Sequence, residues 1–197
     1  MASTYLTRTP SSAGNRKIWT MSLWFKKYST GVRKDFAGNS NVNDGQNGMY
    51  FHWDSGDSLS VVDYGAGSSN WSVVPTRKYR DTNGFYNVVI AVDTTQATAS
   101  NRVKIYVNGE QETSFATSTY PSQNYDTSWN IAKEFAIGSY NSSGGNAFDG
   151  LMAHVHFIDG TAYDASAFGS TDSNGVWTPN TSPSVTYGTN GFFLKFD

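Results

Sequence analysis

The chain has 197 residues, of which 15% are charged, 15% are aromatic and 19 are glycine, with a formal net charge of -2. This small net charge argues against nucleic acid or an anionic membrane as the main partner, and the absence of cysteine excludes a disulfide framework and a thiolate nucleophile. Few charges, many rings and many glycines are typical of short strands joined by turns.

The N-terminus lacks the apolar run of a signal peptide, and no stretch approaches membrane-spanning length. We therefore expect the chain to be made in a cytoplasm. The first short strand is predicted at Tyr5-Leu6, before Pro10 and a turn-forming cluster at 11–15.

Residues 17–27 predict the first long strand. Side chains alternate along it, and the apolar set assigned to the core face is Trp19, Met21, Leu23 and Phe25. The polar residues 39–48 follow as a loop. The loop faintly resembles a calcium loop, but its glycine comes one position late and no closing glutamate follows.

Residues 49–53 and 59–64 predict a hairpin around the turn 54–57, and the segment 85–109 is the centre of the sheet. Val88 to Val92 is apolar on both faces, as expected for a strand covered on both sides. Residues 103–107 alternate, and Asn108-Gly109 suits a tight turn into a returning strand at 110–115.

Further strands are predicted at 135–139, 151–158 and 192–196, and Asp164 is expected to cap one helical turn that Gly169 ends. Because no repeat or linker interrupts this pattern, the sequence predicts a single all-β domain spanning 1–197. Its architecture would be an antiparallel two-sheet β-sandwich, a jelly roll.

Five motifs follow one another in an order that resembles the laminin-G-like, concanavalin-A-like jelly-roll family. They are WTMSLWF at 19–25, FYNVV at 85–89, KIYVNG at 104–109, AIG at 136–138 and FDGLMAHVHF at 148–157. The resemblance covers roughly Tyr5 to Asp164.

A narrower resemblance joins the stretches 5–27, 92–109, 148–160 and 188–196 to stand-alone versions among structural proteins of tailed phages, especially marine and cyanobacterial ones. It implies a non-enzymatic virion protein, either a capsid decoration or a tail or fibre component. The implied partners are other virion proteins, host-surface glycan and further copies of the chain. The alternatives are a free carbohydrate-binding lectin and, less favoured, a glycoside hydrolase.

No catalytic residue is assigned. Glu110 and Glu112 share a strand face, but a strand end beside a turn is expected to be wet, without the burial that raises the pKa of a general acid. His154 and His156 have a spacing that can hold a metal, yet His52 is the only other histidine. An outward-facing polar pair is the favoured interpretation.

Four aromatic residues are the candidate glycan- or partner-binding set: Tyr50, Trp53, Tyr64 and Trp71. Flat rings beside amides and carboxylates suit a sugar, which stacks on a ring and hydrogen-bonds through its hydroxyls. The same rings would equally serve in the core or in a buried interface.

Asp93 and Asp149 are weak calcium candidates, since laminin-G-like domains often hold one calcium at a sheet rim. No family ligand is matched residue by residue here. The alternative is that both aspartates bond their own backbone in turns. Apart from this calcium, the sequence indicates no cofactor.

Overall fold

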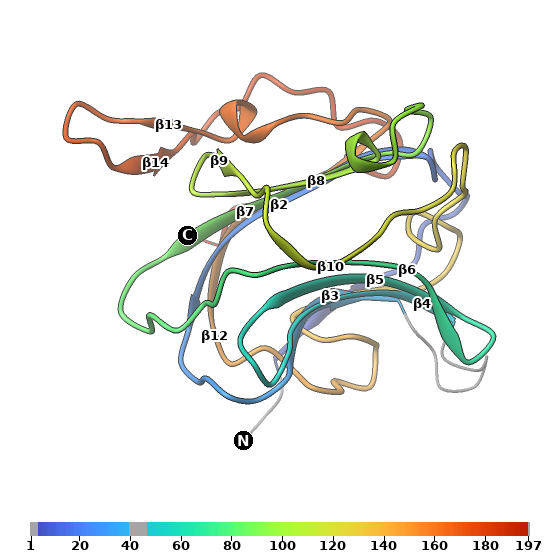
Figure 1. Cartoon of the computed structure of the whole chain (residues 1–197), viewed down its shortest axis with the longest axis horizontal. Helices are drawn as coiled ribbons and strands as arrows, with labels where there is room; N and C mark the ends of the chain where they lie inside the picture. Colours follow the sequence, from blue (N-terminus) through green and yellow to red (C-terminus); the bar gives the residue numbers. More distant parts are fainter. Residues whose placement is uncertain (1–3, 40–46, 197) are drawn as a thin grey trace.

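The computed structural model describes residues 4–39 and 47–196, and the chain forms two antiparallel sheets packed face to face (Figure 1). In pairing order, the seven-stranded sheet contains β1 (Leu6–Arg8), β11 (Phe135–Ile137), β3 (Lys34–Gly38), β4 (Gly48–Trp53), β5 (Leu59–Gly65), β6 (Ser68–Pro75) and β10 (Phe115–Thr119). The six-stranded sheet contains β15 (Phe192–Leu194), β12 (Gly150–Asp159), β2 (Ile18–Lys27), β7 (Tyr86–Asp93), β8 (Val103–Val107) and β9 (Glu110–Gln111). The predicted all-β sandwich is confirmed.

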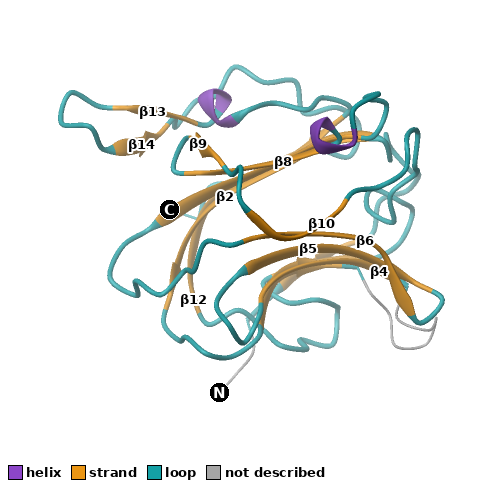
Figure 2. Cartoon of the chain, viewed as in Figure 1, coloured by secondary structure: helices purple, strands orange, loops and turns teal. Residues whose placement is uncertain are grey.

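Helix is confined, within the described residues, to the short 3₁₀ turns η2 (Ala99–Asn101) and η3 (Ala165–Ala167), drawn purple in Figure 2. The Asp164 side chain caps η3 by accepting a hydrogen bond from Ser166 N at 2.9 Å, as predicted. None of the helical residues described here forms a span long and apolar enough to cross a membrane.

The core lies between the two sheets and follows the alternation of the strands. On β2 the four residues assigned to the core face are all buried, and on β8 the inward set is Val103, Ile105 and Val107. Asn108 and Gly109 take φ angles of 48° and 86°, which confirms the tight turn after β8. The β4–β5 hairpin also forms as predicted.

Strand β7 is covered on both faces, as its uninterrupted apolar run predicts. Val88, Ile90 and Val92 belong to the main core, whereas Val89 packs on the other side. There it joins a second apolar cluster with residues of the segment 158–187, which carries the small sheet of β13 (Gly169–Thr171) and β14 (Trp177–Pro179). Figure 1 shows this segment lying over the six-stranded sheet as a third layer.

One predicted pairing is wrong. The returning strand after Asn108-Gly109 is only β9, because residues 112–114 cross to the other sheet and β10 pairs with β6. Strand β1 pairs with β11 and β15 with β12, so the first and last strands lie in different sheets. They still meet at one edge of the sandwich, where Arg8 Nη1 donates to Asn190 O at 2.9 Å.

Candidate functional site

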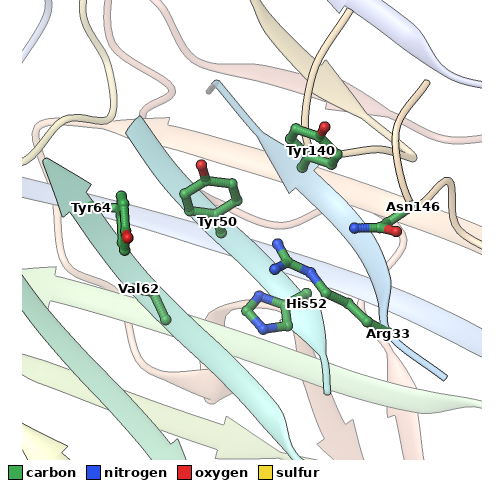
Figure 3. A pocket seen from close by; sticks show the side chains of 7 residues that line it. All are labelled: Arg33, Tyr50, His52, Val62, Tyr64, Tyr140 and Asn146. Carbon is green, nitrogen blue, oxygen red and sulfur yellow. The ribbon is translucent and has the colours of Figure 1, made fainter. Parts of the chain in front are cut away.

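A pocket lies on the outer face of the seven-stranded sheet. Side chains alternate across β4, so Phe51 and Trp53 enter the core and Tyr50 and His52 point away from it. The pocket has a volume of about 410 Å³, within the range of small-molecule sites. Its lining consists of Arg33, Tyr50, His52, Val62, Tyr64, Tyr140 and Asn146 (Figure 3).

Three of the lining residues are tyrosines, and we call this site the tyrosine pocket. The Tyr50 ring lies centrally, 6.1 Å from the Tyr64 ring and 5.9 Å from the Tyr140 ring between centroids. Tyr50 is buried, whereas Tyr64 and Tyr140 are half-buried and flank it. The Tyr64 hydroxyl donates to Gly67 O at 2.7 Å, which fixes its orientation. The rings therefore form a floor and two walls.

Arg33 is the cation of the pocket and is held by a buried carboxylate. Its Nε donates to Asp35 Oδ2 at 3.0 Å and its Nη2 donates to Asp35 Oδ1 at 2.8 Å. Its guanidinium carbon lies 5.3 Å from the centroid of Tyr50, within cation–π range. Burial raises the pKa of Asp35, and the bonds from Arg33 oppose that rise. The bidentate bond fixes the guanidinium plane against the ring.

His52 lies beside this ion pair, with Nδ1 3.9 Å from Asp35 Oδ1. Burial, followed by the charge of Arg33, lowers the pKa of His52 to about 3. The imidazole is therefore neutral at neutral pH. It adds an aromatic and polar surface to the pocket without a second positive charge.

The structure divides the four aromatic candidates into two pairs. Tyr50 and Tyr64 lie together in the tyrosine pocket, on neighbouring strands. Trp53 and Trp71 are each 0% exposed and belong to the main core. For the two tryptophans the core alternative is correct, since a side chain without exposed surface offers nothing to a ligand.

Sequence reasoning missed five pocket residues: Arg33, His52, Val62, Tyr140 and Asn146. His52 shares the outward face of β4 with Tyr50, so the period-two pattern was a usable signal. Tyr140 and Asn146 stand on the loop after β11, which reaches the pocket because β11 pairs with β3. That pairing joins segments about a hundred residues apart and leaves no local signal.

Neither of the two calcium candidates lines this pocket. Asp93 accepts hydrogen bonds from Thr95 N at 3.0 Å, Thr95 Oγ1 at 2.6 Å and Gln96 Nε2 at 2.6 Å. Burial alone would raise the pKa of Asp93, but these bonds outweigh it and lower the pKa. Asp93 therefore acts as a turn residue that bonds to its own neighbours, which was the alternative to calcium binding. Asp149 is half-buried beside a groove at the sandwich edge. Most of the polar loop compared with a calcium loop, residues 40–46, lies outside the described residues.

The histidines do not converge on one point. A bulge between Ala153 and His156 interrupts the alternation of β12, and His154 adopts a φ of 47°. His156 faces outward from the sandwich but is buried beneath the third layer, with its ring 4.1 Å from that of Phe193 and 5.2 Å from that of Phe168. Burial lowers the pKa of His156 to about 4. Among the described residues, no three His, Cys, Asp or Glu side chains gather where they would hold a metal ion.

The prediction that Glu112 is exposed to solvent is wrong, because this side chain is buried and bonded to Arg77 Nε. Arg77 Nη2 also lies 3.9 Å from Oε2 of Glu110, which is exposed. The chain crosses between the sheets here, and Arg77, which follows β6 of the other sheet, bonds to Glu112. Arg77 therefore holds both glutamates, and neither lines the tyrosine pocket.

A family model described as the concanavalin A-like lectin/glucanases superfamily matches residues 2–167. The chain belongs to this superfamily. This concanavalin A-like chain extends past the matched region with most of the segment that forms the third layer. A search of curated protein sequences gave no match.

Solved structures of the superfamily fold resemble this concanavalin A-like chain at low identity. The heptameric SAP-like pentraxin of Limulus polyphemus gives a TM-score of 0.58 at 12% identity, over 97% of this chain and 88% of the pentraxin. The CBM40 domain of the Ruminococcus gnavus IT-sialidase gives 0.53 at 11%, over 82% and 95%. Tailspike protein 2 of an Escherichia coli O157:H7 bacteriophage gives 0.51 at 14%, over 82% of this chain but 22% of the tailspike. At these identities the likeness shows the fold alone.

Proposed function

We propose that this chain is a non-enzymatic binding module whose tyrosine pocket receives glycan. The observation that carries the proposal is the arrangement of three tyrosine rings around the fixed guanidinium of Arg33. A sugar ring offers an apolar face to an aromatic ring and hydroxyls to polar groups. The pocket supplies both, on a face that no other layer of the described chain covers.

Several features favour binding over hydrolysis. A glycosidase needs two carboxyl groups flanking the scissile bond. Among the described acids, Asp35 bonds directly to a lining residue, and it is fully buried beneath Arg33. Glu112 is bonded to Arg77 away from the pocket lining. The similar solved structures include the CBM40 domain, which has also been solved with bound sialyllactose. From this similarity we take only the proposal that the chain binds glycan, not the identity of the sugar.

The second part of the proposal is the place of action: a phage particle, on the capsid or in a tail or fibre. Its support is the sequence resemblance of four stretches to structural proteins of tailed phages, together with the similar fold within a phage tailspike. On a particle the pocket would act in many copies, and avidity would raise weak affinity for host-surface glycan. The alternative remains a free lectin.

A glycan array probed with the purified chain tests binding, and two variants assign it to the pocket. We expect Tyr64→Ala and Tyr140→Ala each to weaken binding about two- to tenfold, since stacking on one ring contributes about 0.5–1.5 kcal/mol. Phe85→Ala removes an exposed ring outside the pocket and serves as the control. Binding that survives both tyrosine variants would refute the site. Mass spectrometry of purified particles tests the virion assignment.

We also propose that copies of the chain associate through one edge of the sandwich. Within the described residues, four exposed large hydrophobics (Leu6, Tyr28, Leu151 and Phe196) line one groove of about 390 Å³. We name them the open-edge patch. Such a cluster is unusual for a free surface, and a two-fold contact would cover the same patch on both copies. Light scattering at micromolar concentration tests this, with Leu151→Lys expected to shift the mass to a monomer and Val176→Lys as the exposed control.

A further inference from the structure

We infer that the tyrosine pocket selects uncharged sugar units and rejects sugars that carry a carboxylate. This inference rests on the proposed glycan binding and adds the chemical class of the ligand. Its basis is that Arg33, the cation of the pocket, is already paired with an anion of its own.

The charge balance of the pocket starts with Arg33 and Asp35. Two of the guanidinium nitrogens lie 3.0 Å and 2.8 Å from the two oxygens of Asp35, and Asp35 has no exposed surface. Water is therefore excluded from the anion behind the cation. A ligand carboxylate entering from the open side would meet Arg33 but also the negative charge directly behind it.

Among the described residues, no second cation lines the pocket to compensate. His52 is neutral at neutral pH, because burial and the charge of Arg33 both disfavour its protonation. The remaining lining residues are the three tyrosines, Val62 and Asn146. A carboxylate that leaves water for this pocket would lose hydration without gaining a free counter-charge.

The same geometry suits a neutral hydroxyl-rich ligand. Arg33 Nη1 and the Tyr140 hydroxyl make no hydrogen bond to any described residue, and the Tyr64 hydroxyl has donated its proton to Gly67 O. The first two groups can donate to sugar hydroxyls, and the third can accept from one. Between them lie the faces of the half-buried rings, on which the apolar face of the sugar would rest.

Matched sugars that differ only at C6 test the inference on the unmodified protein. Oligomers of galactose and galacturonic acid, and of glucose and glucuronic acid, are titrated calorimetrically at neutral pH. We expect the neutral member of at least one pair to bind at least about tenfold tighter than its acidic partner. Acidic oligomers that bind as tightly or tighter, with loss of binding in Tyr64→Ala, would overturn the inference and leave the proposed function intact. Absence of binding by all four oligomers and by a wider glycan array would overturn both.

A second test neutralises the buried charge with Asp35→Asn, which keeps the shape of the side chain and removes the anion. Arg33 then has a free charge, so the preference should move at least about tenfold toward the acidic oligomer. Adding Arg33→Gln to that variant should abolish the gain. Near-UV circular dichroism checks that each variant keeps the native packing. A folded Asp35→Asn protein with an unchanged preference would contradict the role given to Asp35, and if the variants fail to fold, the matched oligomers on the unmodified protein decide alone.

Discussion

Lys27 Nζ lies 3.0 Å from Asp57 Oδ1, and both side chains are buried although both carry charge. Lys27 ends β2 in one sheet, and Asp57 belongs to the β4–β5 turn of the other. The ammonium also donates to Tyr79 O at 3.2 Å, and Gly31 N donates to the carboxylate at 2.9 Å. This ion pair therefore joins the two sheets at the rim of the core.

Removing one partner of this ion pair should destabilise the chain strongly. In Lys27→Met the carboxylate of Asp57 stays buried without its nearest cation, which typically costs about 3–5 kcal/mol. Urea unfolding measures the loss. Lys26→Met, the neighbouring half-buried lysine on the same strand, is the matched control and should change the free energy of unfolding by less than about 1 kcal/mol. Equal losses in the two variants would contradict the role of the ion pair.

Asp57 should also make the stability depend on pH. Burial alone would raise the pKa of Asp57, but bonds from Gly31 N, Lys27 and Arg80 outweigh it and lower the pKa below its ordinary value near 3.8. Its contribution is therefore complete above about pH 4 and is lost as the pH falls through the lowered pKa. Between pH 5 and pH 2, the free energy of unfolding should fall less in Asp57→Asn than in the unmodified chain. An identical fall would disprove the assignment.

Val155→Ala tests the main core. Val155 is 1% exposed on β12, and its truncation should cost about 1–3 kcal/mol through lost burial and a cavity. Val176→Ala is the same chemical change at an exposed position and should cost less than about 0.5 kcal/mol. Chemical denaturation of both variants gives the comparison.

The strand pattern was predictable wherever side chains alternate. On β2 the alternation identifies Trp19 to Phe25 as the inward series, and the next inward position is Lys27, so the same rule places a charge in the core. The partner of that charge was not predictable. Asp57 stands thirty residues away in a turn, and its sequence neighbours suit a solvated turn equally well.

The tyrosine pocket was half predictable. Alternation along β4 separates Tyr50, which faces outward, from Trp53, which is core, and applying that rule would have removed Trp53 from the candidates. Arg33 reaches the pocket through the pairing of β3 with β4. Tyr140 reaches it through the pairing of β3 with β11, which depends on long-range packing. The bulge that turns His154 out of register carries no glycine and gave no sequence signal.

Hydrolysis of polysaccharides should stay at the level of buffer. The buried glutamate of the crossing segment, Glu112, is bonded to Arg77, and Glu110 is exposed. Arg77 holds both carboxylates outside the tyrosine pocket, so neither is placed to flank the scissile bond of a sugar bound there. A reducing-end assay on β-glucans and on any sugar that binds the chain checks this. Turnover that Glu112→Gln abolishes would overturn the prediction.

The third layer should fold together with the sandwich. Phe168, which follows η3, is 2% exposed, and its ring lies 5.2 Å from that of His156 on the outer face of β12. It belongs to the cluster of Val89, Ile158 and Ala165. Phe168→Ala should therefore cost about 3 kcal/mol of global stability, whereas Phe85→Ala, at an exposed ring, should cost far less.

Hydrogen exchange shows whether the third layer unfolds together with the sandwich or opens independently of it. If the layer is part of the cooperative unit, amides of β7 and β12 should exchange faster in Phe168→Ala, because their protection reports the same global opening. If the layer only rests on the sheet, the variant would speed exchange in residues 161–190 and leave β7 unchanged. The burial of Val89 and His156 beneath the layer favours the first result, since opening the layer would expose both to water. Unchanged β7 protection, together with an unchanged free energy of unfolding, would show that the sandwich is stable without its cover.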